Sequence, residues 1–92
     1  MEETNQFKAI DARFVYISIP SIEDVKEFVS TIANFACDAT LCSGRYIVDA
    51  KSIMGVFSLD ATKPIKMLLE VGRNGVDDRD ALCEAIEKFI VD

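Results

Sequence analysis

Histidine and tryptophan are both absent from this 92-residue chain. The lack of histidine removes imidazole bases, imidazole metal ligands, phosphohistidine chemistry and the Ser–His or Cys–His pairs of nucleophilic enzymes. Long apolar runs are absent too, since the longest spans four residues (14–17) and a membrane span needs about 20. We therefore expect no histidine-dependent enzyme, no membrane protein, and no bound metal or other cofactor.

Positive charge is scarce, with 10 Lys and Arg against 16 Asp and Glu, which gives a net charge of −6. A nucleic-acid binder needs a basic face to neutralise phosphates, and an anionic membrane attracts the same kind of surface. We therefore expect neither nucleic acid nor a membrane as a partner of this chain.

Cysteine occurs three times, as Cys37, Cys42 and Cys83, and never in a CxxC pair. Residues 1–13 contain no apolar run, so we expect no signal peptide. An odd number of unpatterned thiols outside a secretory context is typical of a reduced protein, and we predict a cytoplasmic location. No base or metal spacing surrounds the cysteines, so we expect small, buried, unreactive side chains.

The chain has the length of one domain, and its hydrophobic content of 50% is enough for a folded core. Residues 1–11 are polar and show no periodicity, so we interpret them as an N-terminal leader. Residues 12–92 then form the domain, and no repeat, linker or low-complexity segment divides it.

The first half of the domain predicts a strand, a helix and a hairpin. Residues 14–19 are rich in β-branched and aromatic residues and form the strand. Ser21 is a candidate N-cap, and acidic residues follow it in the first helical turn. Apolar residues at i, i+3 and i+4 spacing predict about four helical turns with this buried stripe: Val25, Phe28, Val29, Ile32, Ala33 and Ala36. Residues 38–43 and 45–49 form two strands, joined by a tight turn at Ser43-Gly44.

The second half predicts a short helix, a strand and a longer helix. Ser52 is a candidate N-cap for residues 53–57, and residues 65–71 form a strand. The aspartates at 77, 78 and 80 place negative charge at the start of the last helix and lack the spacing of an EF-hand calcium loop. The buried stripe predicted for this helix is Ala81, Leu82, Ala85, Ile86, Phe89 and Ile90. The order β-α-β-β-α-β-α favours a two-layer α+β fold, with one antiparallel sheet and the helices on one face.

Ten consecutive residues resemble a known segment. Residues 50–59, Ala-Lys-Ser-Ile-Met-Gly-Val-Phe-Ser-Leu, are similar to the regulatory-serine segment of HPr, the small phosphocarrier of the bacterial sugar phosphotransferase system. Phe28-Val29 and the hairpin at Ser43-Gly44-Arg45 also resemble the family, so that the similarity covers residues 13–91. The resemblance implies an open-faced β-sandwich with a four-stranded sheet of order 1-4-2-3.

The histidine motif of this family is missing. HPr proteins carry Gly-Leu-His-Ala-Arg-Pro-Ala where this chain has Ile-Pro-Ser-Ile-Glu-Asp-Val at 19–25, and counting back from Phe28-Val29 places Ser21 at the histidine. A helix N-terminus binds phosphate through free N–H groups and the helix dipole, and Glu23 and Asp24 repel an anion there. We therefore predict that this chain is no histidine-type phosphocarrier and that Ser21 is a helix cap.

Ser52 matches the serine that a dedicated kinase phosphorylates in HPr, and we expect its hydroxyl to cap the short helix and to be accessible. Ile53, Met54 and Phe57 follow at spacings that cannot all face the core, so one or two should be exposed. In HPr the corresponding patch binds partner proteins. Lys51 is either solvated or paired with a phosphate or an acidic partner. The candidate partner-binding residues are therefore Lys51, Ile53, Met54 and Phe57.

Three functional hypotheses follow. The first is a non-catalytic regulatory protein, similar to the histidine-less catabolite-repression HPr proteins, with Ser52 phosphorylated by a kinase and the Ser52–Phe57 surface binding a transcriptional regulator or another protein. The second is a degenerate binding module without phosphorylation. The third is an acylphosphatase-like hydrolase on a similar fold, which requires a basic phosphate cradle that the sequence does not contain.

Overall fold

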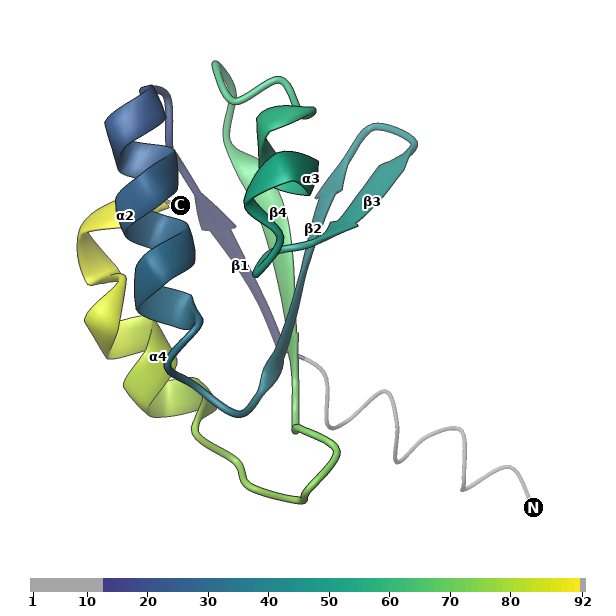
Figure 1. Ribbon diagram of the computed structural model, residues 1–92, viewed down its shortest axis with the longest axis vertical. Coiled ribbons are helices and arrows are strands. Elements are labelled where there is room, and N and C mark those ends of the chain that lie inside the picture. Colours follow the sequence, from purple (N-terminus) through teal and green to yellow (C-terminus); the bar gives the residue numbers. More distant parts are fainter. Residues whose placement is uncertain (1–12, 92) are drawn as a thin grey trace.

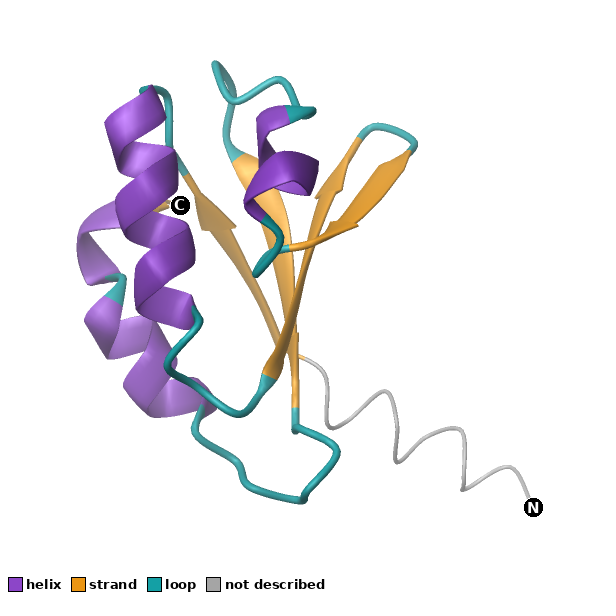
Figure 2. Cartoon of the chain, in the orientation of Figure 1, coloured by secondary structure: helices purple, strands orange, loops and turns teal. Residues whose placement is uncertain are grey.

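The computed structural model describes residues 13–91, and the predicted leader (1–11) lies outside these residues. Their secondary structure alternates between strands and helices (Figures 1 and 2). In chain order the elements are β1 (Arg13–Ile17), α2 (Ile22–Ile32), β2 (Asp38–Ser43), β3 (Tyr46–Asp49), α3 (Ile53–Phe57), β4 (Ile65–Glu70), α4 (Arg79–Ala85), the 3₁₀ turn η1 (Glu87–Phe89) and β5 (Ile90–Val91). None of the described helices is long and apolar enough to cross a membrane.

The sheet is antiparallel, with the order β3-β2-β4-β1-β5. Its four longer strands have the predicted order 1-4-2-3, and the two-layer α+β fold is confirmed. The short fifth strand was not predicted, because residues 86–90 were assigned to the last helix. Helix α4 ends at Ala85, and after the η1 turn Ile90 pairs with Ile17 on the outer edge of β1. The β-branched Ile90 and Val91 fit this edge position well.

One face of the sheet carries the core. Leu41 and Met67 pair across β2 and β4, Ile17 and Ile65 pair across β1 and β4, and all four are fully buried. Helices α2 and α4 lie side by side (Figure 1). Apolar residues of the two helices and of the η1 turn with its N-cap pack into the same cluster: Val25, Phe28, Val29, Ile32, Leu82, Ile86 and Phe89. The helices therefore cover one face of the sheet, as the periodicity predicts.

The opposite face of the sheet is not covered by any described element, and we refer to it as the open face. Residues that pair directly across strands point to the same side, so the register defines its members. They are Phe14, Tyr16, Asp38, Thr40, Cys42, Ile47, Asp49, Lys66, Leu68, Glu70 and Val91.

Both longer helices end before the last residues of the predicted stripes, and several alanines in those stripes are not buried. Ala33 and Ala85 are exposed, and Ala81 is exposed too. Ala36 lies beyond the end of α2, in the loop before β2. Burial of a methyl group contributes little free energy, so alanines at helical spacing are weak evidence that a residue is buried or that a helix continues.

The cysteines only partly follow the prediction of burial. Cys37 is fully buried, whereas Cys42 and Cys83 are half-buried. Cys42 is half-buried because its strand position points to the open face, where no helix packs over it.

Candidate functional site

Ser52 lies at the N-terminus of α3, where the sequence predicts a cap. Its Oγ accepts a hydrogen bond from the backbone N–H of Gly55 at 3.3 Å, and its carbonyl accepts from the N–H of Val56 at 2.9 Å. The side chain is exposed. The hydroxyl therefore stabilises the first turn of α3 while it stays accessible from solvent.

Gly55 allows α3 to lie close to the β2–β3 hairpin. A Cβ at this position would be 3.2 Å from the Cβ of Val48 on β3 and 3.4 Å from the Oγ of Ser52. The contact with Val48 is tighter than an ordinary van der Waals separation, so an added Cβ would require α3 or Val48 to shift by a few tenths of an ångström. The absence of a side chain at Gly55 thus allows the close packing of α3 against β3.

The apolar residues of α3 divide between the core and the surface. Val56 is fully buried and Ile53 packs against the core cluster. Met54 and Phe57 are exposed to 76% and 43%. Two large apolar side chains therefore lie on the surface of the short helix that Ser52 caps.

Lys51 donates two hydrogen bonds within the folded chain. Its Nζ donates a hydrogen bond to the carbonyl of Phe35 at 2.7 Å, and its backbone N–H donates to Oδ1 of Asp49 at 2.9 Å. The side chain is half-buried, so the expectation of a freely solvated lysine is wrong. The ammonium ties the start of α3 to the loop that follows α2.

Ser21 caps α2 as predicted. Its Oγ accepts from the N–H of Asp24 at 3.0 Å, and its carbonyl accepts from the N–H of Val25 at 3.0 Å. Glu23 and Asp24 occupy the first turn. The positive end of α2 is therefore already occupied by a hydroxyl and two carboxylates, an arrangement that disfavours a phosphoryl group.

The aspartates around the start of α4 have three different roles, although the sequence predicts one. Only Asp80 belongs to the first helical turn, where it pairs with Arg13. Asp77 pairs with Arg79, and the hydrogen bonds from Arg79 lower the pKa of Asp77 to about 2. Asp78 accepts hydrogen bonds from the backbone N–H groups of Ala36 at 2.6 Å and Cys37 at 2.9 Å.

Asp78 is a structural residue that the sequence analysis missed. Partial burial raises the pKa of its carboxyl group, but the N–H donors of Ala36 and Cys37 outweigh that effect and lower it below its ordinary value. The carboxylate therefore fixes the loop between α2 and β2 in its ionised form. No local signal identifies this contact, because the donors lie 41 and 42 residues away in the sequence.

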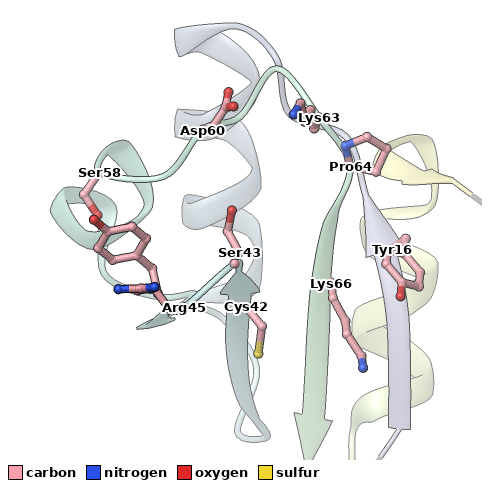
Figure 3. A pocket seen from close by; sticks show the side chains of 11 residues that line it. Tyr16, Cys42, Ser43, Arg45, Ser58, Asp60, Lys63, Pro64 and Lys66 are labelled. Carbon is pink, nitrogen blue, oxygen red and sulfur yellow. The ribbon is translucent and has the colours of Figure 1, made fainter.

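A shallow hollow lies at one end of the open face (Figure 3). It is lined by Tyr16 on β1, Lys66 on β4 and Cys42 on β2, together with Arg45 of the hairpin and Lys63 of the loop before β4. The sequence analysis did not predict this cluster, because its members come from four separate segments.

A comparison with protein families gives a match over most of the chain. The family described as "PTS-HPr: PTS HPr component phosphorylation site" matches residues 24–92, a stretch that contains Ser52 and begins after Ser21. No curated protein matches the chain.

Two solved structures are similar in fold. A phosphocarrier protein HPr from Bacillus anthracis str. Ames has a TM-score of 0.66 and 24% identity, covering 87% of this chain and 95% of its own. HPr-C-His from Thermoanaerobacter tengcongensis has a TM-score of 0.65 and 23% identity, covering 84% and 86%. Both agree with the architecture described above.

Proposed function

We propose that this chain, which belongs to the HPr family of the phosphotransferase system, is a non-catalytic regulatory member that does not carry phosphate on histidine. The chain contains no histidine, and the family's phosphoryl transfer depends on that residue. A serine ester at Ser21 would be a poor substitute, because Glu23 and Asp24 repel phosphate from the same helix end.

In this proposal Ser52 is the switch, and a kinase of the HPr type phosphorylates its hydroxyl. The observation that carries the proposal is that this exposed hydroxyl caps α3, the short helix that carries the exposed Met54 and Phe57. Phosphorylation would add a charge of about −1.5 to −2 at a helix N-terminus, where the dipole and the free N–H groups tolerate it. The modification would therefore change the surface next to the apolar side chains without unfolding the helix.

The partner-binding surface then comprises Met54 and Phe57 at its centre, with Ile53 and Lys51 at its border. A protein partner, such as a transcriptional regulator, would bury the two exposed side chains and interact with the charged phosphate on Ser52. Methionine beside an aromatic ring suits such a surface, because its flexible thioether adapts to a partner. Lys51 would contribute mainly by holding the start of α3 in place, since its ammonium already binds Phe35.

Phosphorylation is tested by incubating the full chain with HPr kinase and ATP and mapping the phosphate by mass spectrometry. We expect one phosphate on Ser52 in the native chain and none in Ser52→Ala. Ser58→Ala is the matched control, since Ser58 is an exposed serine just after the other end of α3. The absence of phosphate from Ser52 in the native chain would refute the switch.

A degenerate binding module is the second candidate, favoured by the same exposed Met54 and Phe57. It would bind its partner through these side chains whether or not Ser52 carries a charge. Equal partner affinity of the native chain, Ser52→Ala and Ser52→Asp would favour this candidate over the switch, whereas Met54→Ala and Phe57→Ala should weaken binding in either case.

A further inference from the structure

Two side chains of opposite charge bind the loop between α2 and β2. The Nζ of Lys51 donates a hydrogen bond to the carbonyl oxygen of Phe35 at 2.7 Å. The carboxylate of Asp78 accepts from the N–H of Ala36 at 2.6 Å and from the N–H of Cys37 at 2.9 Å. All three hydrogen bonds are partly buried, and a lower local dielectric strengthens them relative to exposed ones.

The carbonyl of Phe35 and the N–H of Ala36 belong to the same peptide group. This peptide is trans, so it is planar and rigid, and its oxygen and its hydrogen point in opposite directions. The ammonium therefore lies at the negative end of the peptide dipole, and the carboxylate lies at the positive end. Each hydrogen bond polarises the peptide in the direction that strengthens the other.

Lys51 leads directly into the N-terminus of α3. Its own N–H donates to Oδ1 of Asp49 at 2.9 Å, and the N–H of Ser52 donates to the carbonyl of Asp49 at 3.0 Å. The backbone of Lys51 is therefore held in the turn that precedes the helix, and the next residue supplies the cap. A contact that fixes the side chain of Lys51 thus limits how far the Ser52 cap can move.

We propose that Lys51 and Asp78 form an ion pair that is bridged by the peptide group between Phe35 and Ala36. Through this bridge Asp78 acts as a positioning residue for the Ser52 cap. Loss of its carboxylate weakens the hydrogen bond of the ammonium to the peptide, so the first turn of α3 opens more often. The consequence for regulation rests on the function proposed above, in which Ser52 is the switch. The bridge itself needs no phosphorylation, so experiments without a kinase test it separately.

Amide hydrogen exchange in the two serine-capped helices tests the positioning role. The N–H of Val56 donates to the carbonyl of Ser52, and the N–H of Val25 donates to the carbonyl of Ser21, so the two valines occupy equivalent positions. Asp78→Ala should raise the exchange rate of Val56 about three- to tenfold more than that of Val25. An unchanged rate at Val56, or equal increases at both valines, would overturn the proposal, because equal increases indicate only a general loss of stability.

Two further variants separate the bridge from other effects at the start of α4. Asp78→Asn keeps the size of the side chain and one acceptor oxygen, so it should give a smaller increase at Val56 in the same direction. Asp80→Ala removes an exposed ion pair with Arg13 and should leave Val56 near its native rate. An effect of Asp80→Ala as large as that of Asp78→Ala would contradict the assignment to the bridge.

The shared peptide also predicts that variants at its two ends are not independent. Lys51→Met keeps an unbranched side chain that cannot donate to Phe35, and it should raise the exchange rate of Val56 by a similar factor. In Lys51→Met/Asp78→Ala the rate should stay close to that of either single variant, well below the product of the two factors. Lys51→Arg should keep the native rate, because a guanidinium can donate to the same carbonyl. Effects that multiply in the double variant would refute the bridge.

The amide proton of Ala36 provides a spectroscopic readout in the same samples. In Lys51→Met its NMR signal should move upfield, because the carbonyl at the other end of its peptide is no longer polarised by an ammonium. The amide proton of Cys37 is the matched control, since it binds the same carboxylate but belongs to the next peptide. An Ala36 signal that stays in place, or one that moves no more than that of Cys37, would show that the two charges do not act on one peptide.

Discussion

The carboxylate of Asp78 offers the sharpest test of how this fold is held together. It accepts hydrogen bonds from Ala36 at 2.6 Å and Cys37 at 2.9 Å, and it joins the loop after β4 to the loop before β2. Each hydrogen bond to a charged group contributes about 1.5–3 kcal/mol, and since Asp78 is half-buried, water can partly replace it. We expect Asp78→Ala to lower the free energy of unfolding by about 2–4 kcal/mol.

Urea denaturation followed by far-UV circular dichroism measures this loss, which corresponds to a fall in Tm of roughly 8–30 °C for a domain of this size. Asp78→Asn should lose less than Asp78→Ala, because the amide oxygen can still accept one of the two hydrogen bonds. Asp80→Ala is the matched control. Its exposed ion pair with Arg13 should contribute less than about 1 kcal/mol.

The pH dependence of the unfolding free energy provides a second test of Asp78. The pKa of Asp78 is lower in the folded state than in the unfolded chain, so its stabilisation is fully present above the unfolded pKa. That stabilisation is lost as the pH falls through the folded pKa. The difference in unfolding free energy between the native chain and Asp78→Ala should therefore shrink on acidification below about pH 4. A difference that is small at pH 7, or unchanged at low pH, would refute the role assigned to this carboxylate.

Two further predictions concern the contact between the loop after β4 and the loop before β2. Gly72→Ala should destabilise the protein by about 1–3 kcal/mol in urea denaturation, because the new Cβ would lie 2.3 Å from the carbonyl oxygen of Ala36; an unchanged midpoint would contradict this packing. Burial, together with the Asp78 carboxylate, raises the pKa of the Cys37 thiol to about 11. In the native protein at pH 8 a thiol reagent should therefore modify Cys42 long before Cys37, and equal rates for the two would show that Cys37 is not shielded.

Much of the fold could be predicted from local sequence. Ser21 and Ser52 cap the predicted helices, the turn glycine at 44 adopts a positive φ of 61°, and the four longer strands have the order that the resemblance implies. These features depend on residues within one turn of each other or on a motif of ten consecutive positions. The ends of α2 and α4 were predicted less well, because alanine and isoleucine at helical spacing do not say where a chain leaves the helix.

The candidate site also depends partly on local sequence and partly on tertiary contacts. The sequence places Ser52 next to Met54 and Phe57, and the structure adds that the serine and these two side chains are exposed while Ile53 packs inward. The sequence did not predict the hydrogen bond from Lys51 to the carbonyl of Phe35, because these residues are 16 positions apart and meet only in the folded chain.

The amino-acid sequence by itself determined that this chain has no histidine for phosphate transfer, an acidic start to its first long helix, and a serine cap on its short one. Those properties are composition and local hydrogen bonding, which need no distant partner. Only the tertiary structure decided that Asp78 binds the 36–37 loop and that Lys66 and Glu70 lie on a sheet face that none of the described elements covers. Strand pairing and loop packing join residues far apart in the chain, and the charge pattern of a surface exists only once those residues are neighbours.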